Sequence, residues 1–429
     1  MTSSYHLEDR GKNVPKLRFK GYNDELITVK LNKLFSKIKE KNSNGNITNV
    51  ICNSAKLGLI PQREYFDKDI ANIDNTLGYY VIKNNDFVYN PRKSKDAPYG
   101  PIGIYEYSEI GIVSPLYLVF RKTMDIDTIF FKYYFLSNAW HRYVYLEGDS
   151  GARHDRVSIK DNVFFDMPVK IPSLQEQEKI ASFLTLIDKK IEKQKELVEL
   201  LKKYKRGLLS AIFSQKLRFK DDNGNDYPAW EECRFDEIFQ ILRNNTLSRE
   251  CLNYTDAGVK NIHYGDIIVK YNTCINDEID KIPNINSDIN LDKISDDNYL
   301  KVGDVIMADT AEDYTVGKVC EIVSCKAKIL SGLHTIPCRP KRNFAKGYLG
   351  YYLNSAEYHD KLIPLITGIK VSAISKKEIK KTIIKYPIYM EQAKIANLLI
   401  LIENKLNSNI KKLELLETYK KGLLQQLFI

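Results

Sequence analysis

The chain repeats itself, and this repeat constrains its fold more than any other feature of the sequence. Residues 172–214 align with residues 387–429 without a gap, at an offset of 215 positions, and 19 of the 43 aligned residues are identical. A shorter match, between Lys16-Leu-Arg-Phe-Lys20 and Lys216-Leu-Arg-Phe-Lys220, opens each copy. The sequence therefore predicts two copies of one unit, each a globular segment followed by one long helix.

The two copies have not diverged evenly. Their C-terminal parts are alike, whereas the globular parts match only in short stretches. Those stretches pair Asp86–Tyr89 with Asp304–Met307, Ile112–Tyr117 with Ile329–His334, and Tyr134–Ala139 with Tyr351–Ala356. The contrast indicates that the helices kept one role while the globular segments were free to change theirs.

A heptad pattern of apolar residues runs through both C-terminal parts and predicts long amphipathic helices, the first from Ser173 to about Phe213. Ser173, followed by Glu176 three residues later, predicts a capping box at the start of the first helix. The apolar positions are Ile180, Leu184, Ile187, Ile191, Val198, Leu201, Leu208 and Ile212, then Ile395, Leu399, Ile402, Leu406, Leu413, Leu416, Leu423 and Leu427.

One position of this pattern is polar in both copies, where Gln194 and Asn409 stand. Such a residue is either a tolerated surface-leaning side chain or a pin that sets the register of two paired helices. If the helices are antiparallel and these two residues face each other, apolar residues also face one another. The predicted pairs are Ile180 with Leu423, Ile187 with Leu416, Leu201 with Ile402, and Leu208 with Ile395. We therefore predict an antiparallel coiled coil in this register.

Each predicted helix has roughly 40 residues and a length of roughly 60 Å at 1.5 Å per residue. A rod of this length could hold two globular segments about one turn of DNA apart, roughly 34 Å. A duplicated reader on a rigid spacer suits a target made of two short elements with unread base pairs between them.

The globular segments read as mixed α/β. Strands are predicted at Phe87–Tyr89, Tyr117–Phe120, Val305–Met307 and Val319–Val323, and helices at Asp127–His141 and Ala345–Lys361. Polar and basic loops separate them, and Arg, Lys and Asn on such loops can reach phosphates and base edges. Any single residue could equally be solvated. The candidate DNA-contacting residues are Asn90, Arg92, Lys93, Lys95, Arg153, His154, Arg156, His263, Tyr264, Lys318, Lys370 and Ser372.

Composition supports this picture without deciding it. The formal net charge of +10 and the pI of about 8.9 fit a polyanionic partner, although charge alone is weak evidence. We expect neither a signal peptide nor a membrane span, and the seven scattered cysteines indicate reduced thiols in a cytoplasmic protein. Cys320, Cys325, His334 and Cys338 could hold zinc, but their spacing is loose and buried thiols are the preferred interpretation.

These motifs resemble those of a known family. Two variable segments, each followed by a helix that opens P-x-x-x-E-Q-x-K-I-A and closes Y-K-[RK]-G-L-L-x-x-x-F, resemble the specificity subunit, HsdS, of type I restriction–modification systems. The K-L-R-F opening is also typical of it. The stretch Asn261–Ile267, which contains His263 and Tyr264, resembles a strand of many such recognition domains. The aligned region Ile47–Ser54 lacks the Tyr-Gly-Asp, so we expect the two segments to read different sequences.

The resemblance implies an α+β fold of two target recognition domains in tandem, separated by two helices that form an antiparallel coiled coil with pseudo-twofold symmetry. The expected divisions are recognition domains at 1–172 and 215–387, and conserved helices at 173–214 and 388–429. Each domain would bind half of an asymmetric bipartite site in double-stranded DNA. The helices would dock two methyltransferase (modification) subunits, which restriction (translocase and endonuclease) subunits then join.

The family's chemistry resides in those partners, which would use S-adenosylmethionine, ATP and Mg²⁺; we expect no cofactor in this chain. The sequence contains neither an [NDS]-P-P-[YFW] motif nor a GxxxxGK[ST] phosphate loop. Three alternatives stay open: a self-sufficient DNA methyltransferase, which the missing motifs disfavour, a coiled-coil scaffold, which would not need two divergent basic segments, and a silent recombination partner for another specificity gene.

Overall fold

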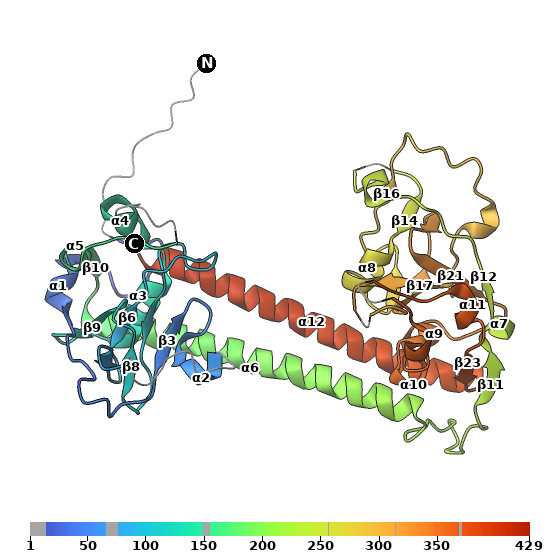
Figure 1. The fold of residues 1–429 in the computed structure, drawn as a ribbon, viewed down its shortest axis with the longest axis horizontal. Coiled ribbons are helices and arrows are strands. Elements are labelled where there is room, and N and C mark those ends of the chain that lie inside the picture. The colour runs from blue at the N-terminus through green and yellow to red at the C-terminus, as the bar shows by residue number, and fades with distance from the viewer. Residues whose placement is uncertain (1–13, 66–75, 149–154, 256, 314, 369–370) are drawn as a thin grey trace. The chain divides into compact units, whose positions relative to one another are not determined.

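The computed structural model describes residues 14–65, 76–148, 155–255, 257–313, 315–368 and 371–429. The chain forms two compact units, the first from residues 1–195 and 411–429 and the second from residues 196–410. Each unit holds one globular segment together with a length of both long helices (Figure 1). The predicted fold class, mixed α/β segments combined with two long helices, is confirmed.

The two long helices are α6, Leu174–Phe213, and α12, Tyr389–Leu427. Both lie inside the predicted helical segments 173–214 and 388–429. Only half of the predicted capping box forms. The Ser173 hydroxyl accepts the backbone N–H of Glu176 at 3.4 Å, whereas the Glu176 carboxylate is held by Arg18.

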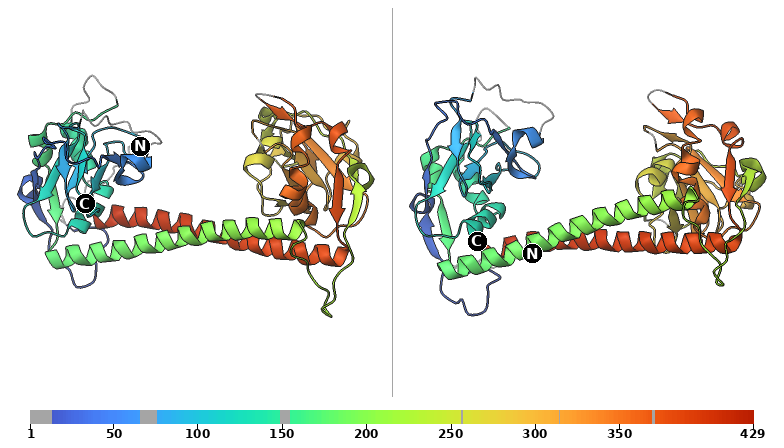
Figure 2. Two further views of the ribbon diagram at one scale, coloured as in Figure 1. Left: turned by 60° about the horizontal axis from the view of Figure 1, so that its bottom comes forward. Right: turned by 90° about the horizontal axis from the view of Figure 1, so that it is seen from below.

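Within each unit, α6 and α12 run antiparallel and side by side (Figure 2). In the first unit, Asp188 pairs with Lys420 at 2.6 Å and Lys195 with Glu417 at 2.8 Å. In the second unit, Lys205 pairs with Glu403 at 3.0 Å. The predicted antiparallel arrangement is therefore present in both units.

The predicted register is wrong by about one helical turn. The residue numbers of the two duplicated ion pairs, Asp188–Lys420 and Lys205–Glu403, each add up to 608, whereas the prediction requires 603. Leu201 accordingly packs with Leu406 rather than with Ile402. The reason is geometric, because an a position of an antiparallel pair faces a d position of its partner, not another a position.

Gln194 and Asn409 fall in different units. The Gln194 side chain is buried, and the Asn409 amide donates to the backbone carbonyl of Lys405 at 2.7 Å. Their mutual contact stays a prediction, and so does the spacing of the two globular segments.

The first globular segment is built around a four-stranded sheet in the order β2-β9-β6-β7, with aromatic residues of α3 packed on one face. Two short ladders, β5–β8 and β3–β4, cover the other side through a smaller core, and β1–β10 closes the segment before α6. The strands are β1 Ile27–Lys30, β2 Phe35–Lys37, β3 Ile51–Ser54, β4 Gly58–Pro61, β5 Tyr80–Ile82, β6 Phe87–Tyr89, β7 Ile102–Ile104, β8 Gly111–Val113, β9 Leu118–Lys122 and β10 Pro168–Ile171. The helices are α1 Leu31–Leu34, α2 Gln62–Tyr65, α3 Thr128–Leu136, α4 His141–Glu147 and α5 Asp161–Phe165.

The second globular segment has the same plan with additions. Its main sheet has five strands in the order β12-β21-β17-β19-β15, and β13-β16-β14-β20 form a second sheet. The strands are β11 Glu231–Arg234, β12 Phe239–Ile241, β13 Leu252–Asn253, β14 Lys260–Ile262, β15 Cys274–Asn276, β16 Asn284–Ile285, β17 Val305–Ala308, β18 Thr310–Ala311, β19 Val319–Ser324, β20 Ile329–Ser331, β21 Thr335–Pro340, β22 Ser372–Ala373 and β23 Ile383–Tyr386. The helices are α7 Phe235–Ile238, α8 Tyr264–Val269, α9 Tyr348–Leu353, α10 Ala356–His359 and α11 Lys376–Ile379.

Buried ion pairs establish which strands correspond. Arg121 on β9 clasps the buried Asp86 beside β6 with contacts of 2.6 and 2.7 Å, and Arg339 on β21 clasps Asp304 beside β17 with contacts of 3.0 and 2.7 Å. The offset between these pairs is 218 positions. The Tyr134–Ala139 match therefore moves by one residue, since Ser137 and Ser355 make the same bond to the carbonyls of Tyr134 and Tyr352.

These serines also explain an error in the predicted helices. The segments predicted as single helices at Asp127–His141 and Ala345–Lys361 are each broken into two. At both breaks a serine hydroxyl bonds to a carbonyl of the preceding turn, which competes with continuation of the helix.

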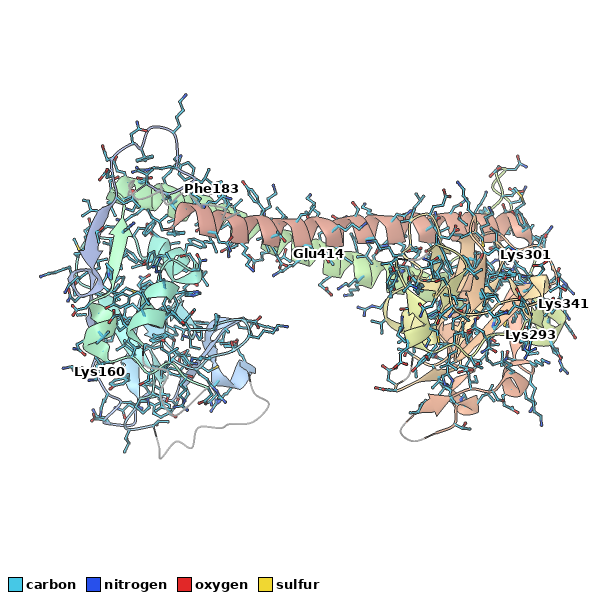
Figure 3. All side chains as sticks on the ribbon, turned by 90° about the horizontal axis from the view of Figure 1, so that it is seen from above. Lys160, Phe183, Lys293, Lys301, Lys341 and Glu414 are labelled. Carbon is cyan, nitrogen blue, oxygen red and sulfur yellow. The ribbon has the colours of Figure 1, made fainter. Side chains whose placement is uncertain are left out.

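The K-L-R-F motif connects the start of each globular segment to a long helix. Arg18 donates to both carboxylate oxygens of Glu176 at 2.7 and 2.8 Å, and Arg218 does the same to Glu391 at 2.6 and 3.2 Å. In the first unit Phe19 also contacts the ring of Phe183, labelled on α6 in Figure 3, at 5.4 Å between centroids. The two motifs of the repeat are therefore the two sides of one clamp, present once in each unit.

Candidate nucleic-acid interface

In the first unit, two loops predicted to contact DNA lie against each other. Arg92 and Arg156 form an antiparallel β-bridge, the Lys93 N–H donates to the Asp155 carbonyl at 2.8 Å, and the Val157 N–H donates to Pro91 at 2.9 Å. Asn90 anchors the loop, since its amide donates to the Asn53 carbonyl at 3.2 Å and accepts the Arg92 N–H at 3.1 Å. The arrangement gathers three cationic side chains, Arg92, Lys93 and Arg156, on a fixed backbone.

The remaining candidates of this segment contribute less. Lys95 is exposed in the turn that the Ser94 and Ala97 backbones close. Arg153 and His154 lie outside the described residues. Sequence reasoning placed the two loops separately, and only the bridge between them shows that they form one surface.

The second unit contains the counterpart of this loop pair. Strands β18 and β22 pair Thr310 with Ala373 and Ala311 with Ser372, and the Ile374 N–H donates to Asp309 at 2.9 Å. Thr310 occupies the place of Arg92, so the same backbone carries a neutral side chain here. Ser372 is half-buried in this bridge, and Lys370 lies outside the described residues.

Tyr264 lies beside this loop pair of the second unit through an aromatic contact. Its ring lies 5.3 Å, edge to face, from the ring of His334, whose backbone has a left-handed φ of +54°. The His334 Nδ1 lies 3.3 Å from both the Thr310 hydroxyl and the Asp309 carboxylate. Tyr264 is thus tied to the β18 strand, and stacking or hydrogen bonding of a base to such a ring is a common mode of nucleic-acid contact.

His263 and Lys318 have structural roles instead. The His263 Nδ1 accepts the Gly265 N–H at 3.2 Å and so caps α8, while burial, assisted by the positive charge of Arg249, lowers its pKa. The Lys318 ammonium donates to the carbonyls of Ile268 and Tyr271 at 2.8 and 3.5 Å and holds the end of α8. Both side chains therefore make contacts within the protein, and their contact with DNA stays a prediction.

Sequence reasoning missed several residues that lie beside these candidates in the second unit. Asn244 donates to the Gly332 carbonyl at 3.3 Å, beside His334, and accepts from the Lys376 ammonium at 3.1 Å. These contacts bring together Asn244, His334, Thr310 and Lys376 from four segments of the chain. His334 was noticed only as a possible zinc ligand, and no local signal marks the others, because their proximity is created by the sheet.

The cysteines considered as zinc ligands make hydrogen bonds to different backbone carbonyls. Cys320 donates its thiol to the Asn272 carbonyl at 3.2 Å, and Cys325 donates to the Leu300 and Ala327 carbonyls at 3.3 Å. Burial raises the pKa of Cys320 to about 12 and also raises that of Cys338. Within the described ranges, no three histidine, cysteine or acidic side chains form a group that could hold a metal ion.

None of the helices in the described part of the chain combines the length and apolar character that a membrane span requires.

Residues 22–202 match the family model of the type I restriction modification DNA specificity domain. A curated relative, the putative type I restriction enzyme MjaX specificity subunit of Methanocaldococcus jannaschii, is 24% identical over 221 residues, which is 50% of this chain. The match spans about half of that relative's own length, 49%.

Solved structures match over nearly the whole chain. A chain from the assembly of a type I R-M system has a TM-score of 0.55 and 14% identity, and covers 95% of this chain and 98% of its own length. The type I restriction–modification S subunit of M. genitalium has a TM-score of 0.53 and 14% identity, with coverages of 97% and 99%. At this identity the likeness concerns the fold. The chain therefore shares the fold of these solved structures, and its residues 22–202 are similar to the type I restriction modification DNA specificity domain.

Proposed function

We propose that the chain is the non-catalytic DNA-recognition subunit of a type I restriction–modification complex. Each globular segment reads one half of an asymmetric, bipartite site in double-stranded DNA. The long helices set the spacer and dock two copies of a modification subunit, which restriction subunits then join. The partners carry the chemistry, with S-adenosylmethionine for methyl transfer and ATP and Mg²⁺ for translocation and cleavage.

The observation that carries the proposal is a duplicated apolar stripe on the solvent side of the helices. Leu186, Leu200 and Tyr204 of α6 recur as Leu401, Leu415 and Tyr419 of α12. All six side chains are between 54% and 70% exposed. Spacings of fourteen and four residues return to the same side of an α-helix, so each triplet is a continuous stripe.

These exposed leucines and tyrosines do not pack in the core between the helices, which is formed by other residues of α6 and α12. Large apolar side chains left in solvent at regular intervals mark protein interaction surfaces. Because the two stripes are identical in residue type, they fit two copies of one partner rather than two different partners. That stoichiometry is the one the family resemblance implies for modification subunits.

The divergent interfaces support an asymmetric target. The first interface presents Arg92, Lys93 and Arg156, whereas the second presents Tyr264 and His334 where the bridge carries Thr310. Cationic side chains and aromatic rings make different contacts with base edges. Two such readers do not suit a palindromic site.

The stripe is tested by co-purifying the chain with its modification subunit and measuring subunit stoichiometry by native mass spectrometry. We expect one specificity chain with two modification subunits for the native protein. Leu200→Glu alone should leave one modification subunit, and Leu200→Glu combined with Leu415→Glu should leave none. Leu116→Glu, an equally exposed leucine of the first globular segment, is the control that should retain both.

The reading function is tested by sequencing methylated adenines in a host with the gene present and deleted. The expected result is the loss of one asymmetric bipartite motif on deletion. Methyl transfer by the purified chain without partners, or no change in the methylated motifs when the expressed gene is deleted, would contradict the proposal.

A further inference from the structure

The two recognition segments differ at one edge of their main sheets. In the second, β15 lies beyond β19 and pairs with it in parallel, Cys274 opposite Glu321. In the first, the sheet formed by the described residues ends at β7, which is the counterpart of β19. Strand β7 corresponds to β19 because β7 pairs with β6 as β19 pairs with β17, and the buried Asp86 and Asp304 precede β6 and β17 at equivalent positions.

The added strand satisfies the backbone of β19. The Glu321 N–H donates to the Thr273 carbonyl at 2.9 Å, and Ile275 is fully buried in the neighbouring core. The next rung of a parallel ladder is donated by the Ile275 N–H. Strand β15 therefore offers its backbone to the sheet edge and inserts one apolar side chain.

The corresponding edge of β7 faces outward. The Asn90 N–H bonds to the Pro101 carbonyl and the Tyr105 N–H to Asp86, so residues 101, 103 and 105 face β6. Alternation in the ladder turns the N–H and C=O of Ile102 and Ile104 to the opposite side. Ile104 is the counterpart of Glu321, whose N–H receives the added strand in the second segment.

A cavity of about 450 Å³ lies beside this edge. Its wall includes β7, the β3–β4 hairpin, Lys132 and Leu136 of α3, and the pair Asp188–Lys420 of the long helices. The counterparts of that last pair are Glu403 and Lys205. Glu403 is close to Cys274 of β15, because burial and the negative charges of Glu321 and then Glu403 raise the pKa of the Cys274 thiol. The cavity and the place of β15 are therefore the same slot in the two segments.

We propose that this cavity is a docking slot for an extended segment of a partner protein, which adds to the sheet as a fifth strand parallel to β7. The occupant presents three residues to the edge, with one apolar side chain at the centre, as β15 does. Leu57 and Leu136 line the slot with half or more of their side-chain surface exposed, which suits an apolar contact.

The charges of the slot favour a peptide over nucleic acid. Lys132 is paired with Glu106 at 2.7 Å and Lys420 with Asp188 at 2.6 Å. Paired charges leave little positive potential for a phosphate backbone, whereas unpaired main-chain donors and acceptors recognise another main chain without regard to its charge. The slot is also distinct from the cationic loops of Arg92 and Arg156.

The probe is a fluorescein-labelled peptide with the sequence of residues 271–277 of this chain, Tyr-Asn-Thr-Cys-Ile-Asn-Asp, added to the full-length protein. Anisotropy should report saturable binding at micromolar to millimolar concentrations. Leu136→Trp, which fills the slot from its rim, should weaken binding at least tenfold. Leu116→Trp, an exposed leucine outside the slot, should leave binding unchanged, and equal melting temperatures of the two variants establish that both are folded.

Backbone N-methylation of the probe separates strand addition from adhesive contact. A methyl group on the nitrogen at the Ile275 position removes the donor that faces the edge and should abolish binding. The same change at the neighbouring Cys274 position points away and should be tolerated. Absence of saturable binding, equal effects of the two methyl groups, or displacement of the probe by an oligonucleotide each overturn the proposal. None of these results bears on DNA recognition or on assembly with the modification subunit.

Discussion

The clamp between the K-L-R-F arginine and the helix glutamate provides a sharp test of how each unit is stabilised. The Glu176 side chain is 1% exposed and that of Arg18 is 10% exposed, so the pair is almost dry. Arg18→Ala leaves a buried carboxylate without its two hydrogen bonds. Removing one partner of a buried pair costs about 3–5 kcal/mol, and we expect about 3 kcal/mol because the arginine lies near the surface. Arg218 is 26% exposed, so Arg218→Ala should cost less, about 2 kcal/mol.

The two tryptophans of the chain allow each unit to be followed separately. Trp140 lies in the core of the first unit and Trp230 packs against the core of the second. Trp230→Phe leaves Trp140 as the reporter of the first unit, and Trp140→Phe leaves Trp230 as the reporter of the second. In a unit of roughly 200 residues, a loss of 3 kcal/mol corresponds to about 6–12 °C in Tm.

Denaturant unfolding followed by tryptophan fluorescence then measures the effect. Arg18→Ala should lower the Trp140 transition and leave the Trp230 transition in place, and Arg218→Ala should do the reverse. Adding Glu176→Gln to Arg18→Ala should recover part of the loss, because it removes the unpaired buried charge. A loss below about 1 kcal/mol, or no recovery in the double variant, would refute the reasoning.

Three further outcomes follow from the structure. Burial raises the pKa of Glu321 from 4.5 to about 7, so the folded second unit binds this proton more tightly than the unfolded chain does. The stability of the second unit should therefore fall by about 3 kcal/mol as the pH rises between these two values. Denaturation measured at several pH values should show this slope in the native protein and a flatter one in Glu321→Gln. Lys205 and Glu403 are less exposed than Lys420 and Asp188, so Lys205→Met should destabilise its unit more than Lys420→Met does, in the same fluorescence assay. Arg92→Ala and Arg156→Ala should each reduce the salt dependence of DNA binding by about one unit in the logarithmic slope, measured by filter binding at several salt concentrations, whereas Lys318→Ala should change stability rather than that slope.

The sequence predicted the local features of the fold well and its tertiary features poorly. The bounds of α6 and the positions of β6 and β17 were predicted almost to the residue, because heptads and short apolar runs are signals within the elements themselves. The breaks after α3 and α9 were missed, since they depend on what one serine hydroxyl bonds to in the preceding turn. The helix register was wrong because matching apolar residues by type ignores which heptad positions face each other in an antiparallel pair.

The candidate interface was predictable only in part. The basic loop at Asn90–Lys95 has a composition that marks it, and the structure places Arg92 and Lys93 beside Arg156. Asn244, Thr310 and Lys376 carry no such mark, because each is an ordinary polar residue until the sheet brings it near His334. Conversely, the sequence marks His263 and Lys318 as candidate DNA contacts. In the structure, His263 caps the start of α8 and Lys318 donates hydrogen bonds to carbonyls at its end.

Strand β15, at the edge of the second main sheet, also could not be predicted from the sequence. Cys274–Asn276 has too few residues for any periodic pattern, and it forms a strand only because β19 presents an edge and Ile275 finds a core. The first segment presents the equivalent edge at β7, with an equivalent acid–lysine pair beside it. Among its described residues, β7 pairs with β6 and with no strand on its other side. Duplication therefore preserved the slot, while divergence changed what the chain itself places in it. A strand edge that is kept without its own partner invites pairing with another chain, which is a liability unless the partner is specific.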